Sequence, residues 1–170
     1  MAKIGLFYGS TSGHTAKVAE AISAALGEKH EVTIINMEDI SSLDDLLEYD
    51  NLILGSSTWG QGDLQNDWRD PFSEMDEADF SGKTVALFGA GDSEKHGEHF
   101  ASAIGVLYNK LVERGAKVVG EVSADDYRFK SSLALKNGKF VGLAIDEINE
   151  PSKTKARIEA WARAIDDSFS

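Results

Sequence analysis

The stretch Phe7-Tyr8-Gly9-Ser10-Thr11-Ser12-Gly13-His14-Thr15 decides how this chain folds. It ends the apolar run Ile4–Tyr8, which is typical of a buried strand, and leads at once into the amphipathic, alanine-rich segment Ala16–Leu26. Where such a loop joins a strand to a helix, free backbone N–H groups and about half a positive charge face outward. The stretch therefore predicts an anion site, and a single phosphate monoester suits it because the loop contains no lysine or arginine.

Two better-known phosphate loops do not match this stretch. A nucleotide-triphosphate P-loop ends in Gly-Lys-Ser/Thr, and here His14 occupies the position of the lysine. The dinucleotide fingerprint needs three glycines, and only Gly9 and Gly13 are present. The alternative without a ligand is a Ser/Thr-rich turn in which a hydroxyl side chain is the N-cap of the helix.

Length and charge narrow the function classes. The 170 residues are expected to form one domain, residues 1–170, that acts as a monomer. With 17 basic and 29 acidic residues, the formal charge of −12 argues against nucleic acid or anionic membranes and favours partners with a basic face. The same acidity could serve solubility alone. Because there is no cysteine, disulfides, thiolate catalysis and thiolate metal sites are excluded. With neither a signal sequence nor a membrane-length apolar run, we expect a soluble, cytoplasmic protein.

Apolar runs alternate with amphipathic segments along the chain. The expected strands are Ile4–Tyr8, Val32–Asn36, Asn51–Ser56, Thr84–Gly89 and Lys117–Glu121, with a further run at Phe140–Ile145. The expected helices are Thr15–Leu26, Leu43–Glu48, Asp67–Met75, Phe100–Arg114 and Thr154–Phe169. This alternation predicts an α/β fold of three layers, in which a doubly wound, five-stranded parallel sheet lies between helices.

One segment interrupts the alternation. Ser123–Lys139 follows the fifth strand, ends in the turn signal Lys136-Asn137-Gly138-Lys139, and leads into the run at Phe140 without a helix between them. We interpret it as an insertion that interrupts the edge strand and returns as a hairpin to complete it. A long surface loop is the alternative.

Three strand ends carry unusual loops, and ligands of open α/β sheets bind beyond such ends. The first is the hydroxyl loop; the others run from Gly55 to Asp63 and from Gly89 to His99. In the second, Trp59 is flanked by polar residues and glycine, where its ring would stay wet unless it stacked on a flat ligand. Trp68 and Trp161 fall in helical patterns and are expected in the core. A phosphate site beside an aromatic platform suggests FMN.

These residues resemble a known family, the flavodoxins of the long-chain type. The similarity runs from Met1 to Phe169 and includes GSTSGHT, STWGQGDLQNDW, SGKTVALFGAGD and NGKFVGLAIDE. The resemblance implies strand order 2-1-3-4-5 with FMN at the switch point, which is the general description of that fold and no deduction from the pattern.

The resemblance also implies roles for residues, none of them catalytic or metal-ligating. The phosphate loop matches Ser10, Thr11, Ser12, Gly13, His14 and Thr15. Residues beside the flavin ring match Ser57, Thr58, Trp59, Gly60, Gln61, Gly62, Ala90, Gly91 and Asp92, with Trp59 stacking on its inner face. Asp146 matches the residue that holds the ribityl chain, although it could instead be a surface aspartate near a helix.

The fourth-strand loop departs from the family pattern. A tyrosine usually stacks on the outer face of the flavin, and the matching residue here is His96. The imidazole either stacks as a smaller ring or swings out and leaves the flavin more exposed. His99 occupies a position where asparagine is common, so its contact with the ring is open.

The function implied by the resemblance is that of a low-potential one-electron carrier. Non-covalently bound FMN would pass between quinone, semiquinone and hydroquinone states, and its partners would be a basic reductase upstream and a metalloenzyme, such as nitrogenase, downstream. The alternative is an FMN-dependent NAD(P)H:quinone reductase, although no loop suggests a nicotinamide pocket. A phospho-receiver domain is disfavoured because Gly9-Ser10 and Ser57-Thr58 stand where its acidic residues belong.

Overall fold

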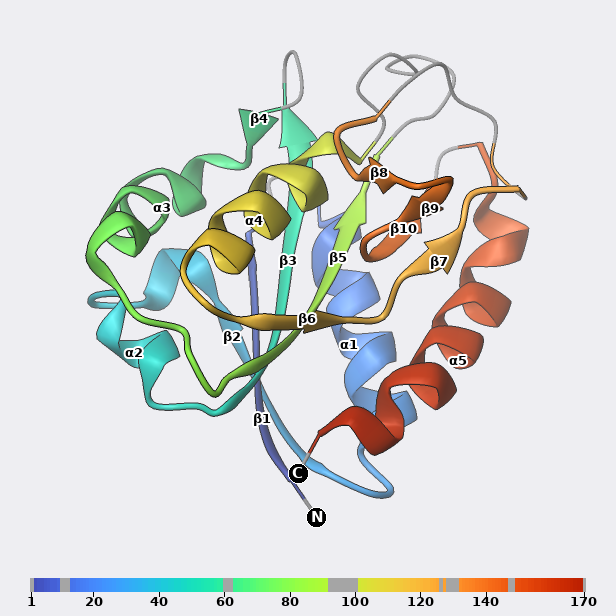
Figure 1. Cartoon of the computed structure of the whole chain (residues 1–170). Coiled ribbons are helices and arrows are strands. Elements are labelled where there is room, and N and C mark those ends of the chain that lie inside the picture. Colours follow the sequence, from blue (N-terminus) through green and yellow to red (C-terminus); the bar gives the residue numbers. More distant parts are fainter. Residues whose placement is uncertain are drawn as a thin grey trace.

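The computed structural model describes residues 2–9, 13–59, 63–91, 101–125, 127, 132–146 and 149–169, and its centre is a parallel sheet (Figure 1). Across the sheet the strands follow the order β2, β1, β3 and β5, with an edge made by β6 and β10. Their bounds are Glu31–Asn36, Lys3–Gly9, Asn51–Trp59, Thr84–Ala90, Lys117–Val119 and Leu143–Ile145. Strands β6 and β10 both pair with β5 and together form the fifth strand of the sheet, so the order is the expected 2-1-3-4-5.

Helices cover both faces of this sheet (Figure 1). One face carries α1, His14–Leu26, and α5, Thr154–Ile165; the other carries α2, Asp44–Leu47, α3, Arg69–Glu74, and α4, Ser102–Glu113. Strand β5 shows why the run Val85–Phe88 is apolar throughout: Val85 and Leu87 pack on the α4 side, while Ala86 and Phe88 pack on the α1 side. A strand buried on both faces needs no polar alternation, so the expected three-layer α/β fold is confirmed.

The insertion divides the edge strand into two pieces. Strand β6 pairs with the first half of β5 and β10 pairs with its second half, in the same direction. Between them lies an antiparallel sheet in the order β7-β9-β8, with bounds Val122–Ser123, Lys139–Phe140 and Leu135–Lys136. Asn137 and Gly138 have φ angles of 54° and 80°, as a tight hairpin turn requires. The interpretation as an insertion completed by a hairpin is confirmed.

The run expected at Phe140–Ile145 is therefore two strands in different sheets. Phe140 pairs with Val122 and Leu135 in the small sheet, whereas Leu143 pairs with Phe88 in the large one. The chain bends between them at Gly142, where an added Cβ would lie 2.4 Å from the carbonyl oxygen of Leu87. An apolar run alone does not reveal such a change of sheet.

Short elements complete the described chain. Strand β4, Asp63–Leu64, pairs with the end of β3, and 3₁₀ turns occur at Met37–Asp39, Asn66–Trp68, Met75–Glu77, Pro151–Lys153 and Asp166–Ser168. Trp68 and Trp161 are buried as expected, and their indole N–H groups donate to the carbonyls of Gly55 and Gly120 at 2.9 and 2.8 Å. None of the helices in the described ranges is long and apolar enough to cross a membrane.

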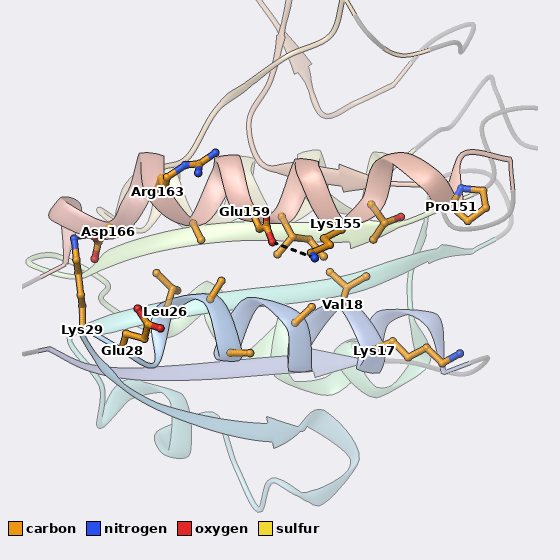
Figure 2. A pocket seen from close by; sticks show the side chains of 16 residues that line it. Lys17, Val18, Leu26, Glu28, Lys29, Pro151, Lys155, Glu159, Arg163 and Asp166 are labelled. Atoms are coloured by element: carbon orange, nitrogen blue, oxygen red, sulfur yellow. Dashed lines mark hydrogen bonds and ion pairs between the residues drawn. The ribbon is translucent and has the colours of Figure 1, made fainter.

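A groove of about 790 Å³ runs between α1 and α5 (Figure 2). Small and aliphatic side chains line it, Ala21, Ala25 and Ile158 among them. Charged residues border it, and two ion pairs, Lys29–Asp166 and Lys155–Glu159, lie along that border. The groove lies on a helical face of the molecule, so it is separate from the strand ends where the sequence predicts a ligand.

Candidate functional site

The carboxyl ends of four strands meet at one edge of the sheet. The register pairs Gly9 of β1 with Ser56 of β3, and Ser57 of β3 with Ala90 of β5. Ala90 also pairs with Ile145 of β10, and the Gly91 N–H donates to the Ile145 carbonyl at 3.0 Å. The three unusual loops and Asp146 therefore begin side by side, as the sequence predicts for a ligand site.

The start of α1 is built to face an anion. Gly13 is the N-cap, with φ of 88°, a conformation that glycine adopts without the penalty that a Cβ brings. The N-cap position is held by glycine rather than by a hydroxyl residue, and the first turn contains no acidic residue. The N–H groups in the first turn of a helix have no partner within the helix, and such groups commonly bind anions.

Three polar atoms beside these strand ends are buried without a hydrogen-bond partner among the described residues. They are Oγ1 of Thr15, Nδ1 of His14 and Oγ of Ser57. Thr15 is 1% exposed, so water does not replace the missing partner at its surface. A buried polar group left unpaired costs about 1–3 kcal/mol. Such groups, gathered where a helix N-terminus favours negative charge, fit the phosphate and polar atoms of a bound nucleotide.

Neighbouring hydroxyls are used for packing the loops. The Ser56 hydroxyl donates to the Ser57 carbonyl at 2.8 Å and accepts from the Gln65 N–H at 3.0 Å. Thr58 Oγ1 accepts from the Ala103 N–H at 3.1 Å and so joins β3 to the start of α4. Thr58, predicted to lie beside a flavin ring, therefore has a structural bond in addition to any contact with a ligand.

Strand β3 continues three residues beyond its expected end. Ser57, Thr58 and Trp59 extend the strand, and Trp59 pairs with Asp63 of β4. This pairing explains the extension, because the chain turns back on itself after Trp59 and supplies an antiparallel neighbour. The side chain of Trp59 lies outside the described part, so its stacking on a ring stays a prediction.

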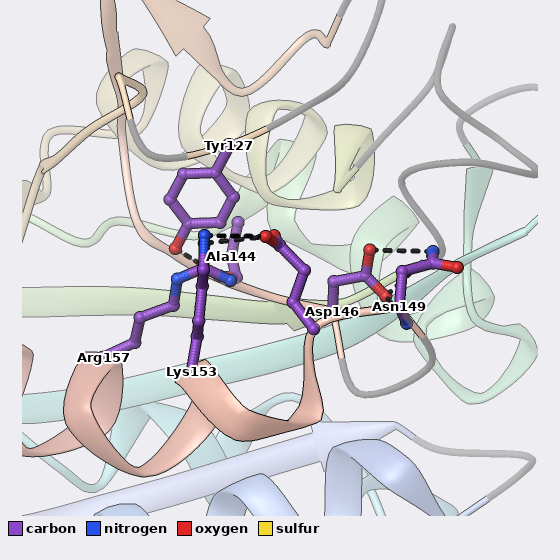
Figure 3. Close-up of polar contacts among 7 residues, drawn as sticks. Tyr127, Ala144, Asp146, Asn149, Lys153 and Arg157 are labelled. Carbon is purple, nitrogen blue, oxygen red and sulfur yellow. Dashed lines mark hydrogen bonds and ion pairs between the residues drawn. The ribbon is translucent and has the colours of Figure 1, made fainter.

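Asp146 follows β10 and is 0% exposed, so the alternative of a surface aspartate is wrong. Its Oδ1 accepts from the Asn149 N–H at 2.9 Å, and its Oδ2 accepts from Asn149 Nδ2 at 2.9 Å (Figure 3). The Glu150 N–H donates to the Asp146 carbonyl at 3.0 Å. The buried carboxylate is thus held in a tight turn at the strand end, next to Gly91.

Glu150 continues this polar cluster onto α5. Its carboxylate pairs with Lys153 Nζ at 2.9 Å and with Arg157 at 3.1 Å. Burial by itself would raise the pKa of Glu150, but the hydrogen bonds and charges of Lys153 and Arg157 outweigh burial and hold that pKa below the ordinary value. Glu150 is therefore ionised at neutral pH.

The other predicted site residues lie outside the described residues, so their roles stay predictions. They are Ser10, Thr11, Ser12, Gly60, Gln61, Gly62, Asp92, His96 and His99. Sequence reasoning also missed several supporting residues. Gln65, 3% exposed, lies so close to β1 that an added Cβ on Gly9 would be 2.3 Å from its Oε1. The only sign of this packing role in the sequence is that Gln65 is a polar residue between two segments expected to turn.

Comparison with known proteins identifies the family. The family model described as flavodoxin matches residues 6–161. The chain belongs to the flavodoxin family. Flavodoxin 1 of Azotobacter vinelandii is 53% identical over 99% of this chain and 98% of its own length. A flavodoxin of Nostoc sp. is 45% identical, with 98% and 97% covered.

A solved structure extends this similarity to the fold. The crystal structure of Fusobacterium nucleatum flavodoxin bound to flavin mononucleotide matches with a TM-score of 0.94 and 34% identity, covering 100% of both chains. Flavodoxins are electron-transfer proteins rather than enzymes, so the expectation of a carrier is confirmed over that of a quinone reductase. The recognition of the family and of its fold from sequence is likewise confirmed.

Proposed function

We propose that residues 1–170 form a single domain that binds FMN non-covalently and carries one electron at a time at low potential. The observation that supports it most strongly is the set of buried polar atoms that have no partner among the described residues, Thr15 Oγ1 and His14 Nδ1 at the start of α1 and Ser57 Oγ near the end of β3. Without a ligand, these unpaired buried groups would lower the stability of the protein. The FMN in the similar Fusobacterium flavodoxin gives the ligand its chemical identity.

Each part of the cofactor has candidate partners in this chain. Amides and side chains of Gly13, His14 and Thr15, with the preceding Ser10, Thr11 and Ser12, would hold the phosphate. Trp59 and the loop of Gly60, Gln61 and Gly62 would cover one face of the ring, and Ala90, Gly91 and Asp92 would line its polar edge. His96 and His99 would lie at the opposite side, and the turn of Asp146 would hold the ribityl chain.

The chain's own charges would set how readily the site accepts electrons. FMN supplies a ring that can take up two electrons singly. Carboxylates near that ring oppose each added negative charge by about 1 kcal/mol at partly exposed sites. For a one-electron step, about 1.4 kcal/mol corresponds to about 59 mV. The formal charge of −12 therefore favours a low potential for the second electron.

The same charge shapes the choice of partners. A surface with 29 acidic and 17 basic residues favours redox proteins with basic docking faces and repels nucleic acid and anionic membranes. A basic reductase upstream and a metalloenzyme, such as nitrogenase, downstream fit this chemistry. Monomeric state and cytoplasmic location, both expected from the sequence, belong to the same proposal.

A reductive titration tests the proposal. Apoprotein loaded with FMN is titrated with dithionite under anaerobic conditions while the absorption spectrum is followed. The expected result is two separate one-electron steps, the second at a potential well below that of free FMN. A single two-electron step at the potential of free FMN would overturn the assignment as a low-potential carrier.

A further inference from the structure

A tyrosine of the insertion, Tyr127, contacts the edge of the large sheet. Tyr127 is 9% exposed, and its ring meets Phe140 edge to face at 4.9 Å between centroids. Its hydroxyl donates to the carbonyl of Ala144 at 2.6 Å (Figure 3). Ala144 lies in β10, two residues before Asp146, so Tyr127 fixes the strand that ends at the proposed cofactor site.

An arginine from α5 packs on that tyrosine. The guanidinium carbon of Arg157 lies 3.8 Å from the centroid of the Tyr127 ring, within the range of a cation–π contact. The side chain is only 8% exposed, and it pairs with Glu150 at 3.1 Å. A buried guanidinium is costly unless it is paired, and the Tyr127 ring and the Glu150 carboxylate, which both contact Arg157, offset part of that cost.

Glu150 completes the connection to Asp146. Its carboxylate forms ion pairs with Arg157 and Lys153, while its backbone N–H donates to the Asp146 carbonyl at 3.0 Å. The turn from Asp146 to Glu150 is thereby attached at its end to α5, as it is attached at its start to β10. Figure 3 shows Tyr127, Arg157 and Lys153 gathered on one side of this turn.

We propose that Tyr127, Arg157 and Glu150 are positioning residues that hold the Asp146 turn in the geometry that binds FMN. This inference rests on the proposed function. It assigns the insertion a role inside its own domain: Tyr127 braces β10 and anchors Arg157, and Arg157 fixes Glu150 and the turn. None of the three residues needs to touch the cofactor, because each acts through the next.

Two variants test the connection, with a third as a matched control. Tyr127→Phe removes the hydroxyl but keeps the ring under Arg157, and Arg157→Met removes the charge while keeping much of the apolar stem. Trp161→Phe is the control, because Trp161 lies one turn from Arg157 on α5 and its indole donates to the carbonyl of Gly120, which precedes the insertion. All three variants lose one or more side-chain bonds that join secondary-structure elements.

The first readout is FMN affinity, measured by quenching of flavin fluorescence on titration of the folded apoprotein. Loss of one well-placed hydrogen bond to a carboxylate predicts a dissociation constant about tenfold higher for Arg157→Met. Tyr127→Phe, which leaves the ion pair intact, is expected to raise it about threefold. Trp161→Phe should leave it within about twofold, since its bond does not reach the turn.

The second readout needs no cofactor and separates this inference from the proposed function. In the apoprotein, amide hydrogen exchange at Asn149 and Glu150 should accelerate about tenfold in Arg157→Met and remain unchanged in Trp161→Phe. If wild-type protein bound no FMN, the proposed function would fail while this exchange result could still hold. Unchanged exchange and unchanged FMN affinity in both Tyr127→Phe and Arg157→Met would overturn the inference, and Tyr127→Phe alone decides if Arg157→Met does not fold.

Discussion

The two ends of the proposed cofactor site are constructed in opposite ways. At the start of α1 and the end of β3, Thr15, His14 and Ser57 each leave a buried polar atom without a partner among the described residues. At the end of β10, by contrast, Asp146 accepts hydrogen bonds on both carboxylate oxygens and Glu150 has two cationic partners. The α1 end contains buried polar groups that a ligand could pair with, whereas the polar groups of the β10 end already pair with other residues of the chain.

This difference separates binding from positioning. An unpaired buried group destabilises the protein until a ligand pairs with it, so the α1 end should gain most from the cofactor. A paired group contributes before any ligand arrives, so the β10 end should support the apoprotein as well. Variants at the two ends should therefore divide differently between FMN affinity and the free energy of unfolding.

The largest effect is expected at the α1 end. A Thr15→Val, Ser57→Ala double variant removes two unpaired hydroxyls while roughly keeping their shape. It should raise the FMN dissociation constant about a hundredfold, because each lost bond to the ligand is worth about 1.4 kcal/mol. Flavin fluorescence titration measures this loss, and urea unfolding of the apoprotein should show equal or higher stability.

The comparison would fail if this double variant bound FMN as wild type does. It would also fail if the apoprotein lost more than about 1 kcal/mol, because that loss would show that the hydroxyls already had partners.

A smaller effect with a pH signature is expected at the β10 end. Glu150→Gln should lower the free energy of unfolding at pH 7 by about 1–3 kcal/mol, since Arg157 and Lys153 lose their partner charge. Because the pKa of Glu150 is held below its ordinary value of 4.5, its contribution is present above that pH and is lost as the pH falls through the lowered pKa. Urea unfolding across acid pH measures the difference between variant and wild type.

That difference should shrink steadily below pH 4.5, the ordinary value for the group. A constant difference from pH 7 to pH 3 would mean that the Glu150 charge does not stabilise the folded state.

A matched pair of glycines isolates backbone strain from binding. Gly13 and Gly138 have φ angles of 88° and 80°, and an added Cβ would meet nothing within 4 Å at either position. Alanine at either one should therefore cost about 1 kcal/mol of stability through strain alone. Only Gly13→Ala should also weaken FMN binding, because only Gly13 sets the first amides of α1.

Fluorescence titration and urea unfolding of both variants provide the measurement. Equal FMN affinity in the two variants would remove Gly13 from the site.

The smallest effect is expected on the border of the groove between α1 and α5. Lys155 and Glu159 lie 3.9 Å apart with side chains 88% and 51% exposed. Lys155→Met should change the free energy of unfolding by less than about 0.5 kcal/mol, which is smaller than the change expected for Glu150→Gln. Thermal unfolding checks this, and a loss as large as that of Glu150→Gln would contradict the distinction between buried and exposed pairs.

Much of the fold could be predicted because it rests on local periodicity. Val85, Ala86, Leu87 and Phe88 are apolar at successive positions, as is typical of a strand covered on both faces, and the structure packs them alternately on the two faces. The turn at Asn137-Gly138 also has its own chemical signal. By contrast, the extension of β3 to Trp59 depends on pairing with β4, and no residue announces that pairing beforehand.

The site divides in the same way. The anion site in the hydroxyl loop could be predicted because glycine and hydroxyl residues together between a strand and a helix are typical of such sites. The contact of Arg157 with Tyr127 joins residues far apart in sequence, and each of them alone resembles an ordinary surface residue. That contact depends on the packing of the insertion against α5, which the chain reaches only when folded.

The central claim is that the start of α1 holds the phosphate of FMN, and titration of the wild-type apoprotein with FMN and with riboflavin tests it most directly. Riboflavin has the same ring and lacks only the phosphate. We predict one FMN bound per chain and riboflavin binding at least about tenfold weaker, as the loss of charge-assisted hydrogen bonds requires. Equal affinity for both compounds, or no binding of FMN, would contradict the account.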